Sequence, residues 1–176
     1  SEGLTLDARR SGSVVALEPL LRLAGDGRLI RRAAGGEVLQ ILGAAQTGDA
    51  ISMDDYSMDP GLGPPLHRHT HEDEVFYILQ GEATFHVGGK VLRSPAGSTV
   101  FAPRGVAHTF ANLGRDRLRM LLMVTPPGNF SRFYGVINAP KPDGSPPGPA
   151  EFAERIGREA PKFGIEMLGP NPLGKD

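Results

Sequence analysis

Glycine and proline interrupt this chain so often that long regular helices are excluded over most of it. The 176 residues include 24 glycines and 16 prolines, whereas ordinary proteins average about 12% for the two types together. Glycine supplies the positive φ angles of tight turns, and proline cannot continue a helix, so such a chain is cut into short segments. Helical periodicity is also weak between residues 35 and 125. We therefore expect an all-β protein.

Short apolar segments bounded by turn signals recur along the first 125 residues. Two consecutive glycines at 88–89 separate residues 83–87 from residues 91–92, a pattern that predicts a two-residue β-hairpin. Closely spaced strands of this kind predict a closed barrel or two packed sheets. The predicted strands cover residues 14–23, 29–34, 37–42, 50–58, 75–79, 83–87, 91–92, 99–102, 108–111 and 117–125.

The pattern changes after residue 126. A short helix is predicted at residues 130–136 and a surface helix at residues 150–159, joined by an exposed, proline-rich linker at residues 139–149. The tail from residue 169 is expected to fray. A chain of this length is most simply one domain. Its expected parts are N-terminal strands and an arm (1–34), the barrel (35–125), and a C-terminal helical segment with linker and tail (126–176).

The bulk composition excludes several classes of protein. The 19 basic and 20 acidic residues leave a net charge of -1, without the basic stripe of a nucleic-acid binder. No apolar run reaches the roughly 18 residues of a membrane-spanning helix, and the first residues lack the pattern of a signal peptide. We expect a cytoplasmic protein without a nucleic-acid or membrane partner. Because the sequence begins with Ser1 rather than methionine, it is also compatible with a leader peptide that has been removed. The absence of cysteine excludes thiolate metal ligands.

Four residues have the chemistry of a metal cage. In a strand, side chains at i and i+2 share a face, so His67 and His69 point the same way. Glu74 follows a short turn on the next strand, near this pair if the two strands form a hairpin. His108 lies on a more distant strand, which barrel closure would bring in. Three neutral imidazoles and one carboxylate suit a borderline divalent transition metal.

The two runs that contain these residues resemble the two signature motifs of the cupin superfamily. The resemblance implies a double-stranded β-helix (jelly-roll) barrel with N-terminal strands and short C-terminal helices. It implies His67, His69, Glu74 and His108 as the ligands of one divalent metal. It also implies a homodimer, in which the N-terminal strands could extend the partner's sheet. The matching positions are Gly61, His67, His69, Glu74 and Gly81, followed by Gly97, Pro103, Gly105, His108 and Asn112.

The sequence does not decide the roles of three titratable residues near the cage. His71 continues the face of His67 and His69, so it either lines the cavity and relays protons or meets solvent. Glu72 and Asp73 compete with Glu74 as the carboxylate ligand. Their positions along the chain make them weaker candidates than Glu74 for binding the metal. We interpret them as solvated groups or as groups that hydrogen-bond a residue that binds the metal.

The cage constrains the metal and the substrate. Four protein ligands leave two positions on a metal that prefers six, so we expect iron, nickel, cobalt or manganese rather than zinc or copper. A divalent ion with one carboxylate leaves a local charge near +1, which favours an anionic oxygen ligand. Aromatic and apolar residues that share faces with the ligands, or that could cover the cavity mouth, are predicted to bind a planar or apolar substrate. They are Phe76, Ile78, Phe110, Phe130, Phe133 and Tyr134.

Residues 128–134 and the tail at 162–169 resemble single-domain, quercetin 2,3-dioxygenase-like cupins. This resemblance implies a metal-dependent dioxygenase for a small aromatic or enolisable substrate, with Glu74 also accepting a proton. A metal-dependent isomerase, epimerase or cyclase that uses no oxygen is the first alternative. A non-catalytic small-molecule-binding cupin is the second. Oxalate chemistry would favour a small polar cavity, in contrast to the aromatic surroundings predicted here.

Overall fold

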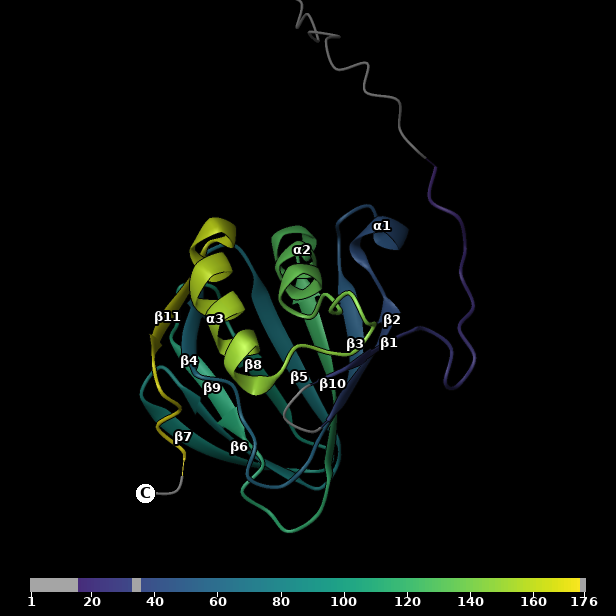
Figure 1. Ribbon diagram of the computed structural model, residues 1–176. Helices are drawn as coiled ribbons and strands as arrows, with labels where there is room; N and C mark the ends of the chain where they lie inside the picture. The colour runs from purple at the N-terminus through teal and green to yellow at the C-terminus, as the bar shows by residue number, and fades with distance from the viewer. Residues whose placement is uncertain (1–15, 33–35, 175–176) are drawn as a thin grey trace, which may run out of the picture.

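The computed structural model describes residues 16–32 and 36–174, which form two antiparallel β-sheets (Figure 1). The six-stranded sheet has the order β1-β2-β3-β10-β5-β8, and the five-stranded sheet has the order β11-β4-β9-β6-β7. The predicted all-β class is confirmed. The strands are β1 (Arg28–Arg31), β2 (Glu37–Leu42), β3 (Ser52–Met58), β4 (Leu66–His69), β5 (Asp73–Gln80), β6 (Glu82–Val87), β7 (Lys90–Pro95), β8 (Thr99–Ala102), β9 (His108–Ala111), β10 (Leu118–Thr125) and β11 (Ile165–Gly169).

Alternating side chains give the six-stranded sheet one buried face. Every second residue of β10 is buried, as expected where successive side chains of a strand point to opposite faces. Strand β3 alternates in the same way, but two of its buried side chains, Ser52 and Asp54, are polar. The buried residues of β10 are Leu118, Met120, Leu122 and Val124.

Three phenylalanines from both sheets form the centre of the core. The ring of Phe76 on β5 lies 5.0 Å from that of Phe85 on β6 and 5.4 Å from that of Phe110 on β9, between centroids. These tilted contacts are favourable arrangements for aromatic pairs. They join the five-stranded sheet to the six-stranded sheet.

The predicted hairpin at residues 88–89 is present between β6 and β7. Gly88 and Gly89 have φ angles of 56° and 82°, and Val87 pairs with Lys90 across the turn. Positive φ at both central residues is the geometry of a type I′ turn, which glycine adopts without strain.

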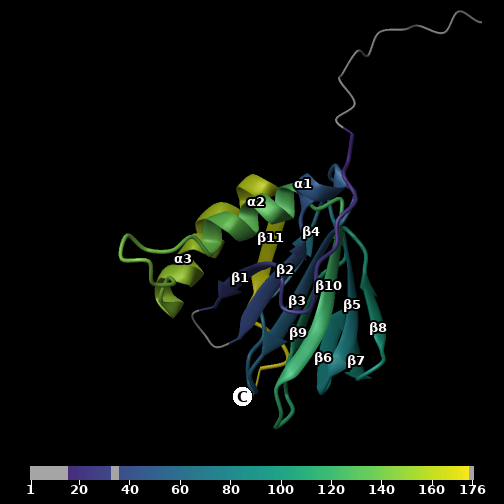
Figure 2. The same ribbon diagram turned by 90° about the vertical axis from the view of Figure 1, so that its right-hand side faces the viewer.

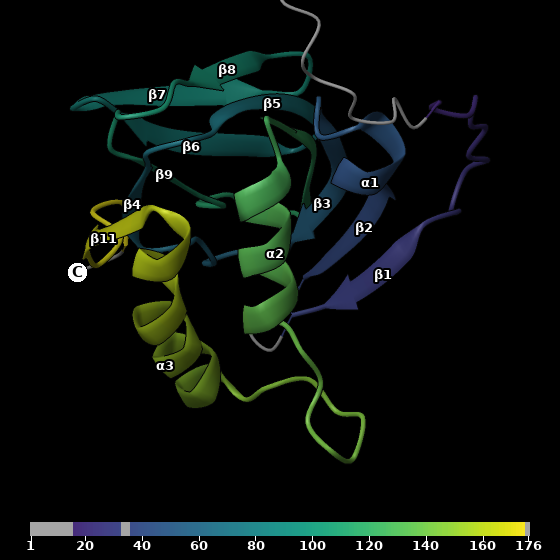
Figure 3. The ribbon, with the colours of Figure 1, turned by 90° about the horizontal axis from the view of Figure 1, so that it is seen from above.

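The C-terminal segment closes one end of the two sheets. Seen from above, α2 (Gly128–Ile137) and α3 (Pro149–Glu159) lie across the opening between the β1–β3 side and the β4–β11 side (Figure 3). Figure 2 shows both helices on the same end of the strands. In the described ranges, no helix is long and apolar enough to cross a membrane.

A second apolar cluster holds these helices to the barrel. Phe152 and Ile156 are one turn apart on α3, so they share the face that packs inward. They pack against a buried cluster that includes Phe133 on α2 and Ile165 on β11. The 3-10 turn η1 (Ala160–Phe163) leads directly from α3 into β11.

The structure corrects several expected boundaries. Residues 16–23 form no strand, and residues 14, 15, 33 and 34 of the predicted strands lie outside the described ranges. Residues 43–49, between two of the predicted strands, contain a short helix, α1 (Ala44–Thr47). The tail contains an unpredicted strand, β11, whose short sequence lacks a clear period of two. This strand pairs with the edge of β4.

The burial of two neighbouring phenylalanines predicts that their substitution has very different effects on stability. Phe76 is fully buried, whereas Phe101 on the adjacent strand β8 is 56% exposed. We expect Phe76→Ala to lower the free energy of unfolding by about 3–5 kcal/mol, because it leaves a cavity in the core. Phe101→Ala should change that free energy by only about 0.5 kcal/mol. Denaturant unfolding measures both, and equal losses would contradict this packing.

Candidate metal centre

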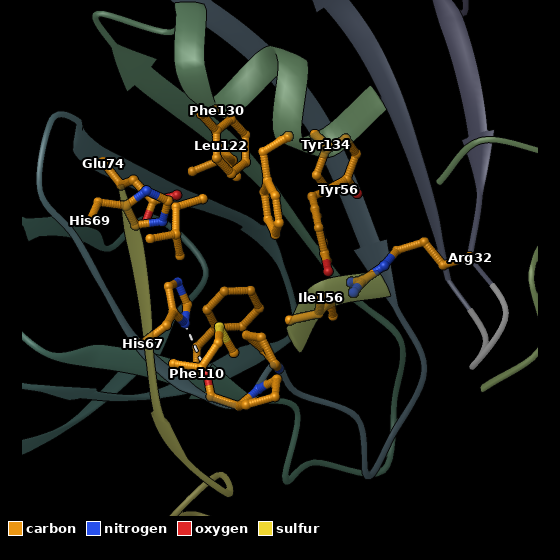
Figure 4. A pocket seen from close by; sticks show the side chains of 15 residues that line it. Arg32, Tyr56, His67, His69, Glu74, Phe110, Leu122, Phe130, Tyr134 and Ile156 are labelled. Carbon is orange, nitrogen blue, oxygen red and sulfur yellow. Dashed lines mark hydrogen bonds and ion pairs between the residues drawn. The ribbon is translucent and has the colours of Figure 1, made fainter. Parts of the chain in front are cut away.

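The four cage residues come from both sheets and meet between them. His67 and His69 lie on β4, and His108 lies on β9 opposite His67. Glu74 lies on β5 of the other sheet. One ligand atom from each of the four residues lies within 4.8 Å of the others. Figure 4 shows His67, His69 and Glu74 at one end of a cavity.

All three imidazoles are oriented by hydrogen bonds at the ring nitrogen Nδ1. His67 Nδ1 donates to the Pro65 carbonyl at 2.8 Å, and His108 Nδ1 donates to the Val106 carbonyl at 3.0 Å. His69 Nδ1 lies 3.1 Å from a carboxylate oxygen of Glu72. A proton on Nδ1 leaves the lone pair on Nε2, which is the arrangement usual for histidines that bind metal ions.

Glu72 is therefore a positioning residue for His69. Its side chain is 1% exposed, and Oε2 accepts the His69 hydrogen bond, while Oε1 has no hydrogen-bond partner within residues 16–32 and 36–174. An ionised carboxylate is costly to bury without an opposing charge. Its place directly behind His69 fixes the orientation of that ring and favours a cation in front of it.

Glu74 is held as an anion by the surrounding histidines. Burial alone would raise its pKa, but His69, His108 and His67 outweigh burial and lower the pKa of Glu74 to about 2. Burial lowers the pKa of His67 to about 4. Burial also opposes protonation of His108, yet its 2.6 Å contact with Glu74 prevails and the pKa of His108 is raised.

The donor set fits a divalent transition metal. Two ligand atoms on opposite sides of an ion lie about 4 Å apart when each bond is about 2.0–2.2 Å. The four ligand atoms here lie within 4.8 Å of one another, so only a small inward movement of these side chains would be needed to bind an ion. Nitrogen and carboxylate donors match the preference of such ions. Binding at His108 Nε2 displaces the hydrogen of its contact with Glu74, so metal uptake should release a proton.

The turn before His108 is fixed by contacts to β4 and β5. The backbone N–H and the guanidinium of Arg104 donate to the Asp73 carboxylate at 2.7–3.1 Å, and they lower the pKa of Asp73. Gly105 donates its N–H to the His69 carbonyl at 2.7 Å with a φ of 79°. This left-handed conformation explains the glycine at that position.

A cavity of about 90 Å³ opens beside the cage. Its walls come from strands of both sheets, from α2 and α3, and from β11. Most of the lining is apolar, and Phe130 lies 5.6 Å from the His69 ring, between centroids. The lining residues are Arg32, Tyr56, Pro64, Pro65, His67, His69, Glu74, Phe110, Leu122, Phe130, Phe133, Tyr134, Ile156, Ile165 and Met167.

Comparison with known proteins decides the family. The sequence matches the cupin domain over residues 55–124. It is 34% identical over 97 residues to an uncharacterized protein of Streptomyces coelicolor. The matched region covers 55% of this chain and 87% of that protein. The chain belongs to the cupin family.

Two further comparisons describe the relatives of this cupin. It is 37% identical over 67 residues to the oxalate-binding protein of Thermotoga maritima, covering 38% of this chain and 55% of that protein. A crystal structure from the same species, described as a predicted oxalate decarboxylase, has a TM-score of 0.53 at 27% identity. That match covers 61% of the cupin and 98% of the solved chain.

The structure separates the predicted substrate residues into two groups. Phe110, Phe130, Phe133 and Tyr134 line the cavity. Phe76 and Ile78 lie in the core instead. Their side chains share the inward face of Glu74, but each step of two residues carries them about 6–7 Å farther along the strand.

His71 does not join the cage residues. Its side chain is exposed and is not part of the cavity lining, because the chain turns between β4 and β5 at this point. Sequence reasoning also missed the far wall, which includes Arg32, Tyr56 and Ile156. No local motif marks these three residues, since separate elements bring them together.

Removal of the Glu72 carboxylate should weaken metal binding without removing a ligand. We expect Glu72→Ala to raise the dissociation constant of the metal about 10–100-fold, with Glu72→Gln intermediate because its amide oxygen still accepts a hydrogen bond. Glu154→Ala on the exposed face of α3 is the matched control. Competitive chelator titration measures the constants, and unchanged affinity in Glu72→Ala would refute the positioning role.

Metal retention should fall as the pH drops below about 6, where ordinary histidines gain a proton. The raised pKa of His108 favours its protonation in competition with the ion, whereas the low pKa of His67 keeps that ring neutral. Elemental analysis after dialysis at a series of pH values tests this. Full retention at pH 4.5 would contradict it.

Proposed function

We propose that this cupin is a metal-dependent dioxygenase for a small aromatic or enolisable compound. The observation that carries the proposal is the junction of the cage with the cavity. Three imidazoles and one carboxylate converge at one end of a space lined mainly by apolar and aromatic side chains. A bound divalent metal would supply Lewis acidity and a position for dioxygen.

The cavity walls can orient a planar substrate and keep water out. Phe110 and Phe130 are 5% and 8% exposed, and both lie beside the cage. The rings of Phe130 and Tyr134 stack at 5.5 Å between centroids, which extends the aromatic wall along α2. A dry site strengthens every electrostatic interaction inside it.

The size of the cavity favours a small substrate. Its volume of about 90 Å³ is below the roughly 300–1,000 Å³ of typical ligand pockets. A small diketone or a single-ring phenol therefore fits this space better than a flavonol does. The quercetinase-like resemblance supports the type of reaction more than the size of the substrate.

The electrostatics of Glu74 favour a ligand role. A carboxylate that accepts protons efficiently has a pKa near the working pH, whereas the three histidines hold the pKa of Glu74 at about 2. Its proposed contribution is a fixed negative charge that binds the cation.

Oxalate binding is a second candidate, because a relative 37% identical over 67 residues is an oxalate-binding protein. The match spans about half the length of that relative. A small dianion would sit at the cage and leave the apolar remainder of the cavity without a role. The lining therefore ranks this candidate below an aromatic or enolisable ligand.

We also propose a homodimer formed through the N-terminal segment. Leu17, Leu20, Leu21 and Leu23 are 46–79% exposed, and β1 is an edge strand of the six-stranded sheet. Pairing of this edge with a second copy would cover apolar surface. Light scattering coupled to size exclusion measures the oligomeric state.

Oxygen consumption tests the proposed reaction. The protein, reconstituted with iron or nickel, is assayed in an oxygen electrode with small diketones, phenols and flavonols. We expect consumption with a small diketone or phenol. Glu74→Gln should lower the rate at least about 100-fold, since metal activation is worth several kcal/mol. Glu154→Gln is the control that keeps the rate.

The remaining outcomes separate the alternatives. Product formation without oxygen would contradict the dioxygenase and favour an isomerase, epimerase or cyclase. Tight binding of metal and ligand without any product would favour a non-catalytic binding protein. Saturable binding of oxalate alone would favour the oxalate candidate.

A further inference from the structure

A cationic side chain lies at the end of the cavity opposite the cage. Arg32 follows β1 directly and enters the cavity from the side facing His67, His69 and Glu74 (Figure 4). The walls between these two ends are apolar, formed by residues such as Phe110 and Ile156. The cavity is therefore polar at both ends and apolar in the middle.

The Arg32 guanidinium is held in place by two aromatic rings. Its central carbon lies 5.1 Å from the Tyr56 ring centroid on β3 and 5.6 Å from that of Phe152 on α3. Cation–π contacts of this kind orient a guanidinium without using its hydrogen-bond donors. The donors therefore remain available to a ligand.

Two buried donors at this end have no partner. The Nε atom of Arg32 and the hydroxyl of Tyr134 are both buried, and neither has a hydrogen-bond partner in the described part of the chain. Buried polar groups are normally paired, because an unpaired one costs about 1–3 kcal/mol. Both residues line the cavity, so a ligand there can satisfy both.

The charges nearby suit an anion. Burial raises the pKa of Tyr134 to about 12, so its hydroxyl stays protonated and donates. Asp54 is the carboxyl that acts on Tyr134, but burial raises the pKa of Asp54 to about 7. Among the described residues, Arg32 forms no ion pair with Asp54 or with another acid, and its contacts are with the Tyr56 and Phe152 rings.

We propose that Arg32 and Tyr134 form a carboxylate-binding site, and that the substrate is an apolar-bodied carboxylic acid whose oxygen donor reaches the cage from the other end. This inference rests on the proposed function for the role of the cage. It adds the class of substrate and two specificity-determining residues. Guanidinium groups pair with carboxylates through two parallel hydrogen bonds, which gives the site its selectivity.

Matched probes test the site. 4-Hydroxybenzoate and 4-hydroxybenzamide differ in charge at one end and keep the same phenol at the other. Each is titrated calorimetrically into the metal-loaded protein and into chelator-treated protein. We expect the carboxylate to bind about 10–100-fold more tightly than the amide, the range of a hydrogen bond to a charged group. The preference should persist after metal removal, because Arg32 is not a metal ligand.

Variants assign the preference to individual residues. Arg32→Gln should abolish it, Arg32→Lys should restore part of it, and Tyr134→Phe should reduce it about 2–10-fold. Arg28→Gln, an exposed arginine on β1, is the control with the same charge change. Thermal unfolding verifies that each variant is folded, and Tyr134→Phe removes a single oxygen, so it tests the site if Arg32→Gln does not fold.

Either of two results would overturn the inference. One is a wild-type protein that binds both probes equally or binds neither. The other is a preference that survives in Arg32→Gln or disappears with the metal, which would place the carboxylate on the metal. If the preference follows Arg32 but the protein takes up no metal and consumes no oxygen, only the proposed function fails.

Discussion

Glu74 from one sheet faces three imidazoles from the other, and the interior of the barrel is organised around this contact. Glu74, His69 and His108 are each at most 3% exposed. Ions buried this deeply are destabilising unless opposite charges and hydrogen bonds compensate them. Here the carboxylate of Glu72, the carbonyls of Pro65 and Val106, and the imidazoles themselves provide those partners. A cation bound to the four would join the two sheets at the point where they face each other.

The two ends of the cavity come from different parts of the chain. All four cage residues lie within the matched cupin domain at residues 55–124. Arg32 precedes that domain, and Phe133, Tyr134, Ile156 and Ile165 follow it. The cage therefore lies inside the matched domain, whereas most of the opposite wall lies in segments outside it.

Sequence reasoning reached the cage because its spacing is local and its chemistry is distinctive. The i and i+2 spacing of His67 and His69 needs only a strand, and Gly88-Gly89 needs only a hairpin. Phe76 and Ile78 show the limit of this reasoning. They do face the interior with Glu74, but the position along the strand decides whether a side chain meets the cavity or the core. Neither the alternation of the sequence nor the residue type determines which positions along the strand meet the cavity.

By itself, the sequence determined the short strands, the turns and the set of candidate metal ligands, because φ preferences, alternation and donor chemistry act within a few residues. Only the tertiary structure decided that Glu72 supports His69, that β11 joins the edge of β4, and that Arg32 faces the cage across an apolar space. Those relations join residues as far apart as Leu66 and Gly169. They arise from the packing of separate elements, which no local pattern records.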